Sequence, residues 1–139
     1  MIGKNLTVAM LSVFLSVPVF AGQDGVEEAA GAYMAAAHNL QSLKQTSCGY
    51  ALLLDGDELS RKAERDILNT IQSKYQKDVS SHIKHSKQIS INLVAENLAD
   101  NRLREKKLDE KTICGIWVGG FTAIYNQYLA LWENAKKNL

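Results

Sequence analysis

The first 21 residues have the pattern of a secretory signal, and this pattern restricts the fold more than any other feature of the chain. Lys4 gives a positive start, an apolar stretch follows, and Val-Phe-Ala at residues 19–21 places small side chains where signal peptidase cleaves. The stretch is shorter than the roughly 20 apolar residues of a confident membrane span. We therefore expect residues 1–21 to be a cleaved signal peptide, with no stable membrane insertion afterwards.

The remaining residues, 22–139, have the size and charge of one globular domain. Removing the signal leaves 139 − 21 = 118 residues, which is too few for two independent cores. Lys4 is the only charge in the signal, so the rest keeps 16 − 1 = 15 basic residues against 15 acidic ones. This balance provides no basic face for nucleic acid, which we exclude as a partner.

Two cysteines, Cys48 and Cys114, are predicted to form one disulfide. Exported proteins fold in oxidising compartments, where two cysteines most simply form one disulfide with each other. The bridge would close a loop of 114 − 48 + 1 = 67 residues. The alternative is two buried thiols. A redox-active dithiol is disfavoured because the pair lacks Cys-x-x-Cys spacing.

The hydrophobic periodicity predicts an all-α fold, a single compact domain of about four helices. The only proline, Pro18, lies in the signal, so no proline interrupts residues 22–139. Asp57 is a candidate N-cap after the Asp-Gly-Asp turn, and residues 50–54 form a short apolar segment of one or two helical turns. The helices are expected at residues 25–46, 58–77, 79–106 and 109–136.

The last of these helices is the most apolar and is expected to be central. No charged residue occurs from Thr112 through Trp132, and apolar side chains cover most of the circumference. A membrane anchor is the alternative, but Asn126 and Gln127 would be costly in lipid. Gly115 and Gly119 lie four apart and predict close packing against another helix.

Aromatic residues of the same helix suggest a binding surface. Tyr and Trp are favoured at interaction hot spots, and a small domain rarely buries every edge of such a helix. Tyr125, Tyr128 and Trp132 are therefore candidate partner-binding residues. They would line a groove for another protein, of unknown identity, or an interface of a homodimer.

Patterns of catalysis, cofactor binding and metal binding are weak in this sequence. No phosphate-binding loop, dinucleotide fingerprint or nucleophile motif occurs, so we predict no enzyme and no cofactor. Asp78, His82 and His85 have a spacing that one helix face could use for a metal. Neighbouring lysines repel a cation, and we interpret these histidines as surface residues.

In its architecture the chain resembles two groups of small exported helical proteins with one long-range disulfide, here at Cys48 and Cys114. These are the acid-stress chaperones of the bacterial periplasm and the helical immunity proteins that block toxins attacking the cell wall. The first hypothesis is a periplasmic or secreted protein-binding module, inhibitor- or immunity-like, that occludes a partner protein. The alternative is a holdase chaperone that exposes its apolar last helix in acid.

Overall fold

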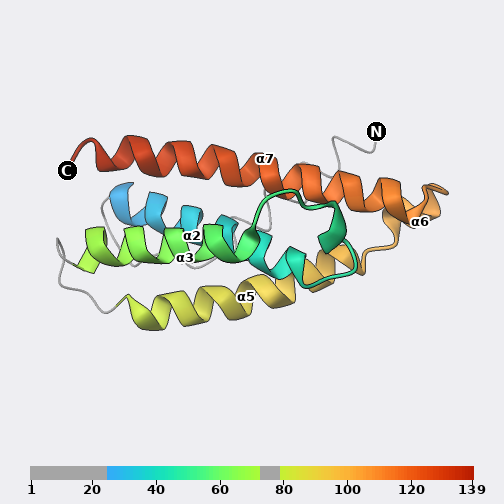
Figure 1. The fold of residues 1–139 in the computed structure, drawn as a ribbon, viewed down its shortest axis with the longest axis horizontal. Helices are drawn as coiled ribbons and strands as arrows, with labels where there is room; N and C mark the ends of the chain where they lie inside the picture. Colours follow the sequence, from blue (N-terminus) through green and yellow to red (C-terminus); the bar gives the residue numbers. More distant parts are fainter. Residues whose placement is uncertain (1–24, 73–78) are drawn as a thin grey trace.

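The computed structural model describes residues 25–72 and 79–139, and within them the chain forms helices and no strand. Successive long helices run in alternating directions along one axis (Figure 1). The predicted all-α domain with four main helices is confirmed. The predicted signal, residues 1–21, lies outside the described residues. In chain order the elements are α2 (Gly25–Lys44), η1 (Gly49–Ala51), α3 (Gly56–Ile67), η2 (Leu68–Gln72), α5 (Ser80–Leu98), α6 (Arg102–Glu105) and α7 (Glu110–Lys136).

The centre of the bundle is α2, and not the C-terminal helix that the sequence suggested. α2 packs against α3, α5 and α7, and it is buried around almost its whole circumference. Small side chains explain this position, since they let three neighbours approach one axis closely. The alanines buried in α2 are Ala29, Ala30, Ala35, Ala36 and Ala37.

Aspartate side chains cap the starts of two helices. The Asp55 carboxylate accepts a hydrogen bond from the backbone N–H of Glu58 at 3.1 Å, and Asp109 accepts one from Thr112 at 2.7 Å. These bonds satisfy backbone donors that a helix leaves free at its N-terminus. The prediction of Asp57 as the cap of the second helix is wrong, because α3 begins at Gly56 and Asp57 lies within its first turn.

The single helix predicted over residues 79–106 is broken. α5 ends at Leu98, and α6 begins at Arg102 after a short turn. Asp100 stabilises this turn, because its carboxylate accepts the backbone N–H of Arg102 at 2.9 Å and also binds the guanidinium of the same residue. Periodicity could not reveal the break, since the apolar pattern continues on both sides of it.

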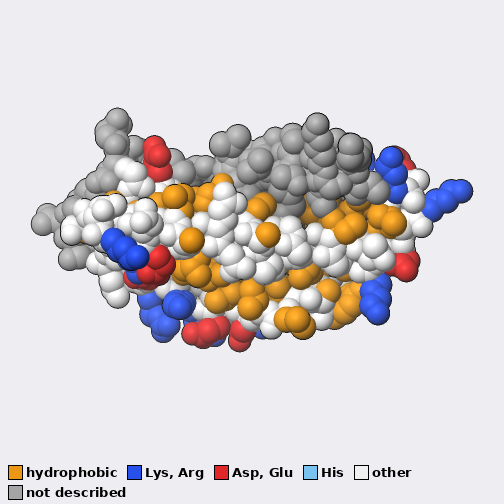
Figure 2. All heavy atoms as spheres, turned by 90° about the horizontal axis from the view of Figure 1, so that it is seen from above, with side chains coloured by type: hydrophobic (Ala, Val, Ile, Leu, Met, Phe, Trp, Pro, Cys, Tyr) orange, Lys and Arg blue, Asp and Glu red, His pale blue; other side chains and the backbone are white. Residues whose placement is uncertain are grey.

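One face of α7 packs against the bundle while the opposite face is open. Trp117, Phe121 and Trp132 are among its buried residues. Gly115 and Gly119 are exposed, and a Cβ built at either position would meet no atom within 4 Å. The predicted close helix packing at these two glycines is therefore wrong. Figure 2 shows hydrophobic side chains along the molecular face seen from the α7 side, with charged groups mainly at its ends and one edge.

The predicted disulfide is confirmed. Cys48, just after α2, is bonded to Cys114 in the second turn of α7, with the two Cα atoms 5.0 Å apart. Both cysteines are buried. The bond therefore joins the end of the central helix to the start of the last one. No helix within the described ranges combines the length and the hydropathy that a membrane span requires.

We predict that replacing both cysteines by serine, Cys48→Ser with Cys114→Ser, lowers the free energy of unfolding by about 4 kcal/mol. The reason is the chain entropy that the unfolded state regains when a loop of this length is opened. Urea unfolding followed by tryptophan fluorescence measures the change.

Reductant provides the control, because it should destabilise the natural chain by a similar amount and leave the double variant unaffected. Equal midpoints for the oxidised and reduced natural chain would contradict the prediction.

Candidate functional site: an exposed apolar loop

The connection between α2 and α3 carries the two most exposed large apolar side chains of the described residues. We call residues 50–54 the apolar loop. Leu53 is 97% exposed, Tyr50 65% and Leu54 38%. Scattered surface leucines are ordinary, but several on one short segment mark an interaction site more often than chance exposure does. In Figure 1 this segment passes across the front of the bundle, beside α7.

Local hydrogen bonds fix the first half of this connection as a 3-10 turn. The backbone N–H of Ala51 donates to the carbonyl of Cys48 at 3.0 Å, and that of Leu52 donates to Gly49 at 3.1 Å. The turn is joined to α2 by the Thr46 hydroxyl, which donates to the Leu43 carbonyl and accepts from the Cys48 N–H. Backbone geometry at the start of the apolar loop is therefore determined before any partner arrives.

Two glycines hold the ends of the connection against α2. A Cβ at Gly49 would overlap the carbonyl group of Lys44, and a Cβ at Gly56 would lie 2.6 Å from the carbonyl oxygen of Leu40. Real side chains essentially never come this close to backbone. Together with the Cys48 disulfide, these contacts fix both ends of the apolar loop.

An ion-pair network supports the second end. The Lys44 ammonium group lies 2.9 Å from Asp57 and 3.4 Å from Asp55. The Lys44 hydrogen bond is the main reason why the pKa of Asp57 is lowered, whereas that of Asp55 is lowered chiefly by the Glu58 backbone N–H. All three side chains are about one third exposed or more, so the network positions the loop more than it stabilises the fold.

Two of the three aromatic residues predicted to bind a partner belong to the core instead. Trp132 is fully buried: its indole N–H donates to Asp66 at 2.8 Å and its ring stacks on Tyr33 at 6.2 Å between centroids. Tyr125 is buried against Tyr33, whose pKa is raised by burial. The prediction is wrong for these two residues. Tyr128 is half-buried and stays a prediction.

A serine, a histidine and a glutamate do come together, but not as an accessible catalytic site. His38 Nδ1 lies 2.8 Å from the Ser86 hydroxyl, and His38 Nε2 lies 3.1 Å from the Glu64 carboxylate. These are the residue types of a hydrolytic triad. Ser86 is only 3% exposed and His38 is fully buried, so no substrate can reach the hydroxyl in this conformation. The cluster connects α2, α3 and α5.

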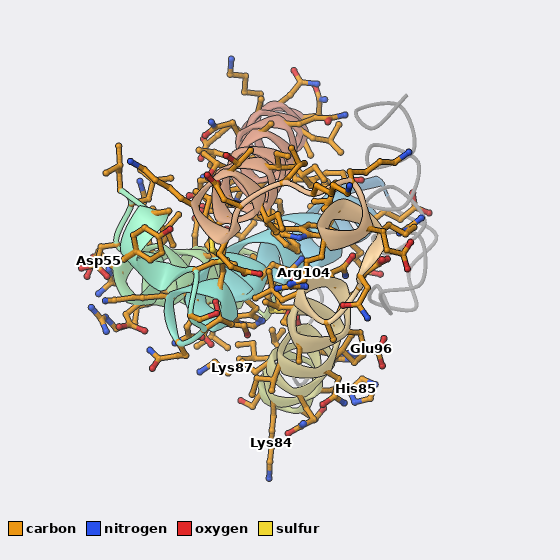
Figure 3. All side chains as sticks on the ribbon, turned by 90° about the vertical axis from the view of Figure 1, so that its right-hand side faces the viewer. Asp55, Lys84, His85, Lys87, Glu96 and Arg104 are labelled. Carbon is orange, nitrogen blue, oxygen red and sulfur yellow. A yellow bond between two sulfur atoms is a disulfide. The ribbon has the colours of Figure 1, made fainter. Side chains whose placement is uncertain are left out.

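A metal site is not formed by the residues that the structure describes. No group of three or more histidine, cysteine, aspartate or glutamate side chains in those ranges could hold an ion. His85 is exposed and projects from α5 away from the bundle (Figure 3). Asp78, the third residue of the weak metal pattern, lies outside the described residues.

No known protein guides the interpretation of this surface. No protein family matches the chain, and comparisons with curated proteins and with solved structures find no match for it. The geometry of the apolar loop therefore has to carry the functional argument alone.

Sequence reasoning could not identify this site. The apolar residues 50–54 are typical of a buried turn. Leu53 is exposed because of the path that the chain takes from α2 to α3, which hydrophobic spacing does not reveal. The Asp-Gly-Asp turn that follows was the available signal, since it marks where an exposed connection ends.

We predict that Gly49→Ala and Gly56→Ala each destabilise the fold and disturb the apolar loop, because the added methyl group meets α2 backbone that cannot move away. Gly115→Ala and Gly119→Ala are the matched controls, and each should stabilise the protein by about 0.5–1 kcal/mol. Thermal unfolding compares the four variants. A stable, unperturbed Gly49→Ala protein would contradict the proposed clamping of the loop.

Proposed function

We propose that the chain is an exported protein-binding module, inhibitor- or immunity-like, that occludes a partner protein by means of the apolar loop. The observation that carries this proposal is the exposure of Leu53 and Tyr50 on a segment fixed at both ends. A flexible segment could bury its leucine against the bundle. The fixed backbone of the apolar loop instead keeps Leu53 exposed to solvent, where a partner can bind it.

Preorganisation favours affinity. Association must offset the ordering of loops and side chains, and a loop that is already ordered loses less entropy on binding. Hot spots are commonly an apolar or aromatic anchor surrounded by a polar rim. Here Leu53 and Tyr50 would be the anchor, and the charged residues Lys44, Asp55 and Glu58 would supply part of the rim.

Export is supported by the covalent structure. A formed disulfide is typical of oxidising compartments such as the periplasm or the extracellular space. The signal pattern of residues 1–21 supports the same location. Both fit an inhibitor that meets its target outside the cytoplasm.

The alternative function, an acid-activated holdase chaperone, has one observation in its favour. α2 is apolar and buried on nearly all sides, so any opening of the bundle would expose a large surface able to hold unfolded clients. This surface belongs to α2 more than to the last helix. Light scattering of an aggregating client at about pH 3 tests the idea, and absence of suppression would remove it.

We predict that Leu53→Asp weakens binding of the partner at least about thirtyfold, the loss expected of a hot spot worth about 2 kcal/mol. A charge at this position cannot enter an apolar pocket. Because Leu53 is almost fully exposed, the fold itself should be unaffected. The partner is isolated with the natural chain from the exporting organism, purified, and titrated against each variant by calorimetry.

Leu131→Asp is the matched control, since Leu131 is 48% exposed on α7, far along the chain from the apolar loop. It should bind as the natural chain does. Equal affinities of all three proteins, or recovery of only a second copy of the chain, would contradict occlusion of a partner by this loop.

A further inference from the structure

A buried histidine joins three helices near the middle of the bundle. His38 of α2 contacts Glu64 of α3 through one ring nitrogen and Ser86 of α5 through the other. It is completely buried, and Ser86 is nearly so. Buried polar groups are retained where their hydrogen bonds are satisfied, and here both ring nitrogens have a partner.

The partners assign the protons of the neutral ring. A carboxylate can only accept, so Nε2 carries the hydrogen and donates to Glu64. Nδ1 is then the acceptor, and the Ser86 hydroxyl donates to it. A second proton on the ring would occupy Nδ1, so the Ser86 hydroxyl would have to turn and accept from it, and the hydrogen of the hydroxyl would lose this acceptor.

The surrounding charges do not favour a histidine cation. The charged groups that face His38 are Glu64 from α3 and Lys87 from α5. The Lys87 ammonium group lies 2.8 Å from the same Glu64 oxygen that His38 contacts, so this carboxylate already has a cationic partner. Burial is the main cause that lowers the pKa of His38, and Lys87 lowers it further, while Glu64 acts in the opposite direction.

We infer that His38 is an acid-sensitive latch, which holds α3 and α5 against α2 most strongly while its ring is neutral. The Ser86 and Glu64 contacts are the two arms of this latch. Mild acid would place a cation in a buried site whose facing carboxylate, Glu64, is already paired with Lys87. The inference does not rest on the proposed binding function, since it concerns the bundle and not the apolar loop.

The direction of the pH effect follows from the pKa difference between the two states. In the unfolded chain His38 titrates at about pH 6.5, and in the folded chain lower. The stability from the neutral latch is fully present above about pH 6.5, and it is lost as the pH falls from there toward the folded pKa. Carboxylates have an ordinary pKa of about 4, so they change the stability mainly at pH values below those at which His38 does.

The test is urea unfolding of the natural chain between about pH 7 and pH 5. The unfolding equilibrium constant should rise by up to about tenfold for each unit of pH lost, because the unfolded state binds one extra proton. His38→Gln should lose this dependence. His85→Gln is the matched control, since His85 is exposed on α5 (Figure 3), and it should keep the dependence. Equal slopes for the natural chain and His38→Gln would overturn the latch.

A second measurement needs no change at His38. In the NMR titration of the histidine ring signals, the His38 ring should remain neutral until the pH falls below about 6.5, the ordinary value for histidine, and protonation of His38 at or above that pH would overturn the inference. Lys87→Gln should raise the pH at which His38 titrates, because it frees Glu64 to pair with the cation. Lys84→Gln is the control, because Lys84 projects away from the bundle on the same helix (Figure 3).

Discussion

The junction between the end of α2 and the first turns of α7, closed by the Cys48–Cys114 disulfide, is the constraint on which the rest of the structure depends. It brings together two helices that are far apart in sequence and fixes their antiparallel arrangement. It also sets the point from which the chain must turn back to begin α3. The exposed apolar loop is a consequence of that turn.

The interior follows from the small side chains of α2. Alanines let three helices pack around one axis, but each buries little apolar area, so larger side chains must fill the rest of the core. α7 supplies Trp117, Phe121 and Trp132, and the Trp132 ring stacks on Tyr33 of α2. α2 itself adds Tyr33, Met34, Leu40 and Leu43, so both helices supply large side chains to the core.

Much of this fold could be predicted from the sequence, because it depends on local patterns. Hydrophobic spacing located the four helices, and the compartment indicated by the signal pattern favoured the bond between Cys48 and Cys114. The errors arose where tertiary packing decides. The long uncharged apolar stretch suggested α7 as the centre, although the small side chains of α2 decided which helix is central. Asp100 ends a helix whose apolar pattern continues past it.

The candidate sites were beyond sequence reasoning for a similar reason. Exposure of Leu53 and burial of His38 both depend on which elements pass over them, and neither residue has a local signature. Trp132 illustrates the opposite case, because its aromatic character suggested a binding surface while Asp66 and Tyr33 hold it in the core.

The central claim is that the apolar loop is rigid in the free protein, and NMR relaxation of its backbone amides tests this most directly. The account predicts order parameters for residues 50–54 near 0.85, about equal to those of the flanking helices α2 and α3. Values below about 0.6 would show a flexible segment and would contradict the account.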